Sequence, residues 1–167
     1  EGSATLVLVT PAYSNLVAYN PAKPNEIAGD LAEKWEVSAD GKTVTWKLKE
    51  GLVYSDGKPV TCSDFKFTLQ AWLTPGVGVV STTGYDKVDT VDCPDPNTIV
   101  IKFKEFYAPY LTLFGSDLIP QHVAGDPKDM KNWAFNRKPI GTGPFKVDEW
   151  VADSHVTLSR NENYREK

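Results

Sequence analysis

The sequence is poor in the residues on which metal and nucleophilic chemistry most often depend. Its 167 residues include two histidines, His122 and His155, and two cysteines, Cys62 and Cys93, with a single methionine. Two cysteines do not make a structural zinc site by themselves, because such a site takes four nitrogen or sulfur ligands. We therefore expect neither a metal ion nor a cofactor.

Arginine is scarce as well, and no hydrophobic run is long. Arginine supplies three of the eighteen cationic residues, the cations are scattered along the chain, and the net charge is -4. These features argue against a nucleic-acid partner. The longest apolar stretch, Leu6 to Val9, is far shorter than the roughly 20 residues that span a bilayer.

Aromatic residues, by contrast, are plentiful. Five Trp, seven Tyr and seven Phe supply ample core material. This aromatic content argues against a disordered chain. Hydrophobic residues make up 41% and charged residues 24%, the balance of a soluble globular protein. A chain of this length is large enough for one ordinary domain, and no convincing domain boundary or internal repeat interrupts it.

The N-terminal segment supports two interpretations. A stripe of apolar residues recurs at steps of three and four, formed by Leu6, Val9, Tyr13, Leu16 and Val17. This spacing favours a helix over residues 3–18, although Pro11 would kink or interrupt it. The alternative is a strand from Thr5 to Thr10 followed by a short helix. The helix is the interpretation that we favour.

Alternating segments beyond residue 30 predict antiparallel strands. Asp40-Gly41 is a strong hairpin signal, and the run Thr43 to Lys49 after it places apolar and polar side chains on opposite faces. Further strands are predicted over Val88 to Cys93, Thr98 to Lys104, Phe145 to Trp150, and His155 to Arg160. The sheet content is therefore mainly antiparallel.

One clear helix is predicted between these strands. Thr61 can cap it, and Asp64 lies in its first turn, where the helix dipole favours an anion. Val60 and Phe65 are placed for a hydrophobic staple across the cap. Pro75-Gly76 ends the helix.

A shorter helix is expected over Tyr107 to Phe114. Together the predicted elements make an antiparallel-rich α+β single domain.

The aromatic residues divide into two groups. Those on regular apolar faces are expected in the core, namely Trp35, Trp46, Phe65 and Trp72. Those in or beside loops could stack on a sugar or a peptide, namely Tyr85, Phe114 and Trp133.

Two motifs invite a chemical interpretation that their surroundings weaken. Gly141-Thr142-Gly143 looks like a phosphate loop, but Pro144 supplies no backbone N–H and no Lys-Ser or Lys-Thr pair follows. A tight turn that leads into a strand is the better interpretation. Cys62 would need a nearby base to act as a nucleophile, and neither histidine can be placed beside it. We therefore expect that this protein is not an enzyme.

Several motifs are weak singly but specific in combination and order. They are YSNLV (13–17), GDLAEKWEVS (29–38), DGKT (40–43), LKEGLVYSDGKPVT (48–61), DFKFT (64–68), DPNT (95–98), IGTGPF (140–145) and RNENY (160–164). In this order they resemble the family 5 bacterial extracellular solute-binding proteins, the group that binds peptides, dipeptides and nickel for ABC importers. The resemblance covers nearly all of the chain.

The resemblance implies a receptor whose two lobes close on a solute, such as a peptide, and then dock on an ABC permease without covalent chemistry. Family members are much longer, so we expect residues 1–167 to be a piece, the subdomain inserted into the first lobe of a monomeric protein. The expected location is extracytoplasmic, either periplasmic or at the cell surface. Because the sequence starts at Glu1 rather than Met, a signal peptide or lipid anchor would lie outside it.

The resemblance also bears on the cysteines, since family members commonly have other small residues at both positions. Cys62 starts a predicted helix and Cys93 ends a predicted strand. Two such replacements within one subdomain imply a Cys62–Cys93 disulfide, which an extracytoplasmic location permits. Two buried free thiols are the alternative. A bridge would stabilise the fold by roughly 3 to 4 kcal/mol in the chain-entropy model.

The family's cleft is lined mostly by the two large lobes, so the resemblance implies few solute contacts here. They would come from the loop after the main helix and the loop before the Ile-Pro segment. The candidates are Val80, Ser81, Thr82, Thr83, Tyr85, Phe114, Gly115, Ser116 and Asp117. A second hypothesis is a stand-alone extracellular adhesion or interaction domain, which predicts a sizeable exposed apolar patch.

Overall fold

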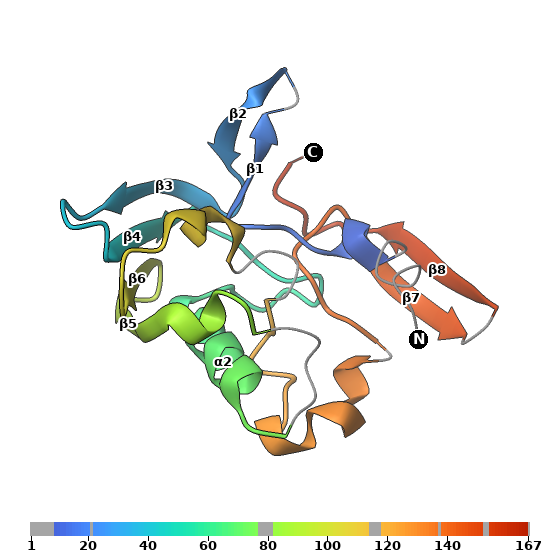
Figure 1. Cartoon of the computed structure of the whole chain (residues 1–167). Coiled ribbons are helices and arrows are strands. Elements are labelled where there is room, and N and C mark those ends of the chain that lie inside the picture. The colour runs from blue at the N-terminus through green and yellow to red at the C-terminus, as the bar shows by residue number, and fades with distance from the viewer. Residues whose placement is uncertain are drawn as a thin grey trace.

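A four-stranded antiparallel sheet and one α-helix form the body of the protein, and two β-hairpins project from it (Figure 1). This is the arrangement of a computed structural model. It describes residues 9–20, 22–76, 82–113, 118–136, 138–151 and 154–166. The predicted antiparallel-rich α+β class is confirmed.

The sheet of the body has the strand order β3-β4-β6-β5, and all neighbours are antiparallel. Its strands are β3 (Ala32–Val37), β4 (Thr43–Leu48), β5 (Val88–Asp95) and β6 (Thr98–Phe103). The alternation predicted for β4 is observed, since Val44, Trp46 and Leu48 are fully buried. In the register Trp46 lies opposite Trp35 on one side and Ile99 on the other, so β4 carries the centre of the core.

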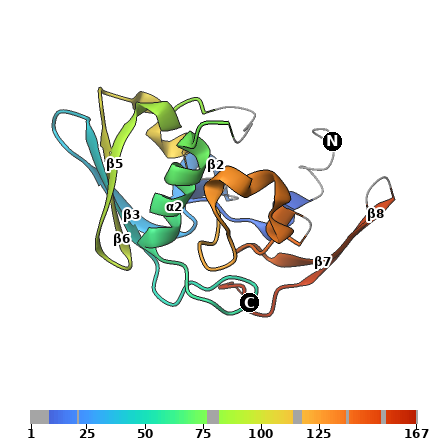
Figure 2. The same cartoon turned by 90° about the horizontal axis from the view of Figure 1, so that it is seen from below.

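Helix α2 (Cys62–Leu73) covers the sheet, and its start agrees with the prediction. Figure 2 shows α2 between the strands of the body and the short helices of residues 127–136. Val60 before the cap and Phe65 after it are both buried, as a hydrophobic staple requires. The helix stops before Gly76, whose φ of 84° lies in the left-handed region that glycine tolerates.

The projecting hairpins come from opposite ends of the sequence. One pairs β1 (Val17–Asn20) with β2 (Lys23–Gly29), and the other pairs β7 (Phe145–Val151) with β8 (His155–Arg160). The strands predicted at β7 and β8 are confirmed. Each hairpin is a sheet of two strands among the described residues.

Apart from Val9, which is α-helical, the remaining described helical residues lie in 3-10 turns. They are η1 (Thr10–Ala12), η2 (Tyr85–Lys87), η3 (Ala108–Thr112), η4 (Pro127–Asn132) and η5 (Ala134–Asn136). The short helix predicted from residue 107 is therefore present as η3, with Pro109 in its first turn. Its prediction included Phe114, which lies outside the described residues.

The helix predicted over residues 3–18 is wrong in its second half. Residues 1–8 lie outside the described part of the chain, Val9 is α-helical as predicted, and η1 follows it. From Tyr13 the backbone is extended, and Val17 already begins β1. The physical reason is that carbonyls of this segment accept long-range hydrogen bonds: Leu16 O accepts from Asp30 N (2.9 Å), and Ala12 O accepts from Gly143 N (2.9 Å).

The predicted disulfide is present. Cys62 and Cys93 are bridged with their Cα atoms 5.7 Å apart, across a sequence separation of 31 residues. Beside the bridge, Cys62 N donates to Pro96 O at 2.7 Å. These two contacts bind the first turn of α2 to the end of β5 and the turn that follows it.

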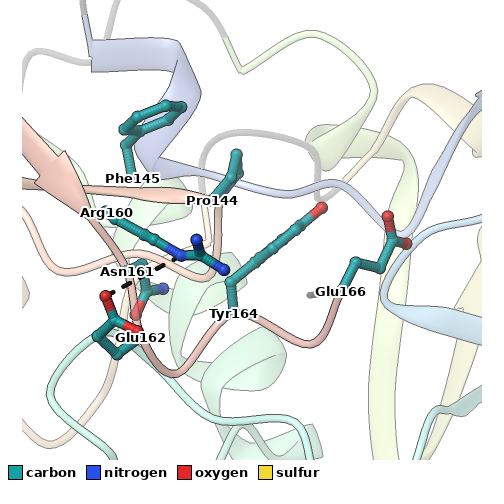
Figure 3. A pocket seen from close by; sticks show the side chains of 7 residues that line it. All are labelled: Pro144, Phe145, Arg160, Asn161, Glu162, Tyr164 and Glu166. Carbon is teal, nitrogen blue, oxygen red and sulfur yellow. Dashed lines mark ion pairs between the residues drawn. The ribbon is translucent and has the colours of Figure 1, made fainter.

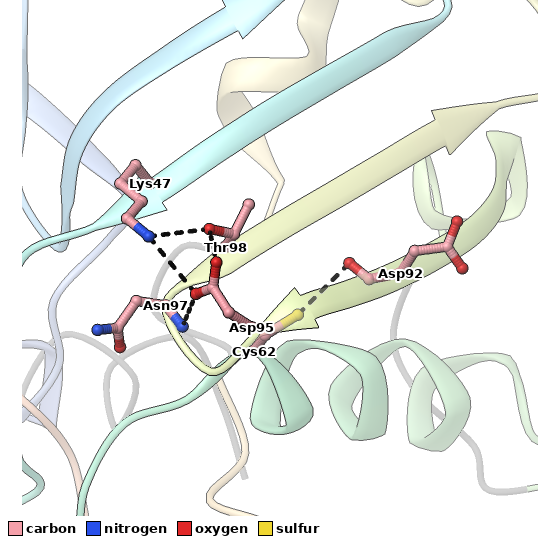
Figure 4. Close-up of polar contacts among 6 residues, drawn as sticks. All are labelled: Lys47, Cys62, Asp92, Asp95, Asn97 and Thr98. Atoms are coloured by element: carbon pink, nitrogen blue, oxygen red, sulfur yellow. Dashed lines mark hydrogen bonds and ion pairs between the residues drawn. The ribbon is translucent and has the colours of Figure 1, made fainter.

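That turn is itself held by polar contacts around Asp95 (Figure 4). The Asp95 carboxylate accepts from Thr98 Oγ1 (2.6 Å), from Asn97 N (2.8 Å) and from Lys47 Nζ (3.5 Å). These donors, with the Thr98 hydroxyl first, hold the pKa of Asp95 below its ordinary value. These contacts therefore hold the β5–β6 turn in place beside the first turn of α2.

Replacing both cysteines by alanine should lower the free energy of unfolding by about 3 kcal/mol, because the unfolded chain regains the freedom of a 31-residue loop. Urea unfolding followed by far-UV circular dichroism measures the change. A reductant should destabilise the unchanged protein by a similar amount and leave the double variant unaffected. Equal stability of the two proteins without reductant would contradict the bridge's role.

Candidate functional site

Helix α2 positions the two loops that carry the predicted solute contacts. The first loop leaves the helix after Leu73. The second ends at Ile119, whose backbone N–H donates to Thr68 Oγ1 (2.9 Å). Thr68 is fully buried and donates its own hydroxyl hydrogen to Asp64 O (2.7 Å). One hydroxyl on the helix therefore fixes where the second loop returns to the body.

Asp64 supports the same segment from the first turn of the helix. Its Oδ1 accepts from Gln121 N (2.9 Å), and its Oδ2 accepts from Thr61 N (2.9 Å). The carboxylate is almost fully buried, and both oxygens have backbone donors. The residue predicted as a helix-start signal thus also anchors the chain beyond the second loop, which sequence reasoning missed.

Three of the predicted solute contacts lie within the described residues. Thr83 is exposed, Thr82 is half-buried, and Tyr85 is 5% exposed. The Tyr85 ring stacks on Trp72, with centroids 5.3 Å apart and planes at 16°. Thr83 is thus the most exposed of the three, and a solute contact by any of them stays a prediction.

The other predicted contacts lie outside the described residues. They are Val80, Ser81, Phe114, Gly115, Ser116 and Asp117. The residues on either side of these loops are described, and they define where the two loops begin and end. Leu113 and Leu118 are both buried in the main core, so the second loop starts and finishes at fixed points.

The structure brings the end of the first loop against the start of the second. Gly84 has a φ of 87°, and a Cβ atom there would lie 2.4 Å from Tyr107 Oη and 2.9 Å from Leu113 Cδ2. Both the backbone conformation and the lack of space require glycine at this position. The described end of the first loop, at Gly84, therefore lies against Leu113, where the second loop begins.

Trp133 lies between η4 and η5, beside a loop as predicted, but its side chain packs within the protein and is not presented for stacking on a ligand. It is 7% exposed, and its ring stacks on Phe67 with centroids 6.1 Å apart. Its indole Nε1 donates to Asp126 O (3.0 Å). Both the ring and its polar atom are occupied, so Trp133 packs the outer side of α2.

A second group of polar contacts joins the two ends of the chain. Asn161 Nδ2 donates to Gly143 O (2.8 Å), and Ser14 Oγ donates to Thr142 O (3.2 Å). A Cβ atom on Gly143 would lie 2.4 Å from Pro11 O, so two backbones cross here without room for a side chain. The motif at 141–143 is thus the tight turn into β7, as predicted.

Arg165 closes this junction from the C-terminal side. Its guanidinium pairs with the Asp30 carboxylate, and its Nη1 donates to Ser14 Oγ (3.0 Å). Asp30 also accepts from Asn15 N (2.8 Å). The side chains of Arg165 and Asp30 are 16% and 13% exposed, so the pair is largely shielded from water.

A pocket of about 430 Å³ opens beside the junction, at the base of the β7–β8 hairpin (Figure 3). It is lined by Pro144, Phe145, Arg160, Asn161, Glu162, Tyr164 and Glu166. Burial, and then the charge of Glu166, raise the pKa of Tyr164. The lining mixes both charge signs with two aromatic rings, which suits packing or binding and supplies no paired nucleophile and base.

Groups that catalysis or metal binding would use are engaged in other contacts. The Cys62 sulfur is bonded to Cys93, so it is not a thiolate nucleophile. His122 Nε2 lies 2.7 Å from Asp56 Oδ2. Across the part of the chain that the structure describes, no three His, Cys, Asp or Glu side chains are grouped to hold a metal ion. The same residues include no helix long and apolar enough to cross a membrane.

The arrangement of elements is that of bacterial solute-binding proteins. Bacillus subtilis AppA, solved with a nonapeptide, superposes with a TM-score of 0.86 at 24% identity and covers 98% of this chain. Campylobacter jejuni NikZ, solved with Ni(L-His), gives 0.86 at 23% identity over 95% of the chain. MoaA from A. tumefaciens R10, solved with mannopinic acid, gives 0.83 at 29% identity over 99%.

The chain belongs to the bacterial extracellular solute-binding proteins, family 5, because the profile of that family's middle region matches residues 26–167. A Brucella ovis protein that carries the name of an ABC transporter peptide-binding protein is 38% identical over 92% of the chain. Protein XP55 of Streptomyces lividans is 31% identical over 77%. The chain spans 29% and 23% of the lengths of these two relatives, and about a third of the solved structures.

Thr68→Val should lower the free energy of unfolding by about 2 kcal/mol, because the buried Ile119 N–H loses its acceptor. Thr68→Ser keeps the hydroxyl and is the matched control, with a smaller loss from the missing methyl group. Urea unfolding compares them, and amide exchange at Ile119 reports the contact directly. Equal exchange at Ile119 in the valine and serine variants would contradict the anchoring role.

Arg165→Met should lower the free energy of unfolding by about 2 kcal/mol, because Asp30 is left largely buried without its cation. Arg160→Met is the control, since the Arg160 side chain is 68% exposed and its distance to Glu162 is 4.0 Å. Thermal unfolding should separate the two variants clearly. Similar melting temperatures would mean that the junction does not depend on Arg165.

Proposed function

We propose that this chain is part of the extracytoplasmic receptor of an ABC importer, which captures peptides or similar small solutes and delivers them to the permease. The observation that carries the proposal is the family match over residues 26–167. The relative from Brucella ovis, with its peptide-binding name, supports the solute class. An extracytoplasmic location also suits the Cys62–Cys93 disulfide, since oxidising compartments allow such bonds to persist.

The chain forms one portion of the first lobe, and the remaining lobe structure lies in polypeptide beyond it. This part of the proposal is supported by the share of the relatives that the chain spans, which is about a third or less. In a receptor of that size, solute is captured between lobes that close around it. Binding energy then shifts the population toward the closed form, and no covalent step is involved.

Within this receptor, the chain's own contribution to the cleft comes from the two loops anchored on α2. Thr82 and Thr83 are the described residues whose side chains reach the surface there. Hydroxyl groups can donate to and accept from the backbone of a peptide, which suits a receptor for solutes of varied sequence. The close packing at Gly84 and the Thr68–Ile119 hydrogen bond hold the described ends of the loops in place.

A thermal-shift and calorimetric screen of the full-length receptor with peptides tests the proposal. Peptides should raise the melting temperature of the full-length protein and have little effect on the 167-residue chain, which lacks most of the cleft. Replacing Thr82 and Thr83 by alanine should weaken peptide binding about fivefold, the loss of roughly one hydrogen bond. Thr90→Ala, at an exposed site on β5, is the control.

Two results would overturn this assignment. A gene product that ends near Lys167 would exclude the two-lobed receptor and favour a stand-alone interaction domain. Absence of binding to any peptide by a full-length protein that folds would remove the proposed solute class.

A further inference from the structure

The β1–β2 hairpin carries an uncovered pair of large apolar side chains. Tyr19 on β1 and Ile27 on β2 are direct cross-strand partners, so they lie on the same face. Tyr19 is 73% exposed and Ile27 is 42% exposed. Neither belongs to any of the hydrophobic clusters that the described residues form.

The hairpin needs support that the described residues do not give on this face. It projects away from the body as a sheet of two strands (Figure 1). An isolated two-stranded hairpin is marginally stable in water, and a third strand or a packed partner is what stabilises it. By comparison Phe106, which is 66% exposed, has a structural role, because its ring lies against Gly41 on the β3–β4 turn.

The C-terminal segment leads directly to this hairpin. It leaves β8 at Arg160 and is fixed at the β7–β8 base by Asn161. It then reaches Arg165, which pairs with Asp30 immediately after β2 and with Ser14 before β1. The described part of the C-terminal segment therefore lies, at Arg165, beside the base of the β1–β2 hairpin.

We propose that, in the whole receptor, polypeptide following Lys167 packs on the face of the β1–β2 hairpin that carries Tyr19 and Ile27. This inference rests on the proposed function. The relatives are about three times as long as this chain, so such polypeptide is available in a receptor of their size. The hairpin tip is polar, with a Lys23–Glu26 ion pair (3.1 Å). Apolar contact is therefore centred on the Tyr19–Ile27 pair, with the ion pair at the rim.

Amide hydrogen exchange by mass spectrometry on the full-length receptor and on the 167-residue chain tests this packing. Peptides spanning residues 17–29 should exchange about tenfold more slowly in the full-length receptor, without added solute. Peptides over the β3–β4 turn, residues 37–42, are the internal control and should exchange alike in both proteins. Equal exchange of residues 17–29 in the two proteins would overturn the proposal.

Two other occupants give different outcomes, and each would overturn it. Protection of residues 17–29 that arises only when a peptide solute is added would assign the face to solute. Protection in the 167-residue chain that grows with its concentration, together with a dimer in analytical ultracentrifugation, would assign the face to a second copy. A gene product ending near Lys167 would instead defeat the proposed function on which this inference rests.

Variants give an independent measurement. Replacing Tyr19 and Ile27 by threonine keeps the β propensity of both positions while removing their apolar surface. The double variant should lower the melting temperature of the full-length receptor by about 2 °C or more and change that of the 167-residue chain far less. Val37→Thr, on β3 and 41% exposed, is the matched control and should behave alike in both. Equal shifts of the double variant in both proteins would contradict the packing.

Discussion

The first turn of α2 is bound to the sheet through the Cys62–Cys93 disulfide and the hydrogen bond from Cys62 N to Pro96 O. With that turn fixed, Asp64 and Thr68 have fixed positions too, and they hold the backbone of Gln121 and Ile119. Both candidate loops are attached to this helix. A helix free to shift on the sheet would move the ends of both loops at once, so the positions of Thr83 and Leu113 depend on a bond formed elsewhere in the sequence, between Cys62 and Cys93. The covalent link is thus a positional constraint as well as a stabilising one.

A separate set of contacts determines how the hairpins meet the body. The Gly141–Gly143 turn crosses the backbone of Pro11 and Ala12, and Arg165 joins Asp30 to Ser14. Segments from both ends of the sequence therefore share one junction. The chain spans about a third of the length of the solved structures that it matches, and this junction is where its two hairpins meet the body.

Most of the regular structure could be predicted because its signals are local. The β4 alternation, the Thr61–Asp64 helix start and the Asp40-Gly41 turn each need only a few neighbouring residues. The N-terminal helix failed beyond Tyr13 because residues 12 to 16 are held by partners near residues 30 and 143, which no local pattern reveals. The burial of Trp133 was missed for the same reason, since its partner Phe67 is distant in sequence. The disulfide was predicted from a family resemblance, and Gly84 was missed because its two close neighbours come from residues 107 and 113.

The crossing at Gly143 has a consequence for the order in which the protein forms. Ala12 O receives its hydrogen bond from Gly143 N, and Arg165 must be present before Asp30 gains its cation. These partners are far apart in the sequence, since Ala12 pairs with Gly143 and Ser14 with Arg165. Ala12 and Ser14 therefore gain these partners only when parts of the chain that are distant in sequence have come together. Contacts of such long separation slow folding, so the body around β4 and α2 is expected to assemble first and the junction last.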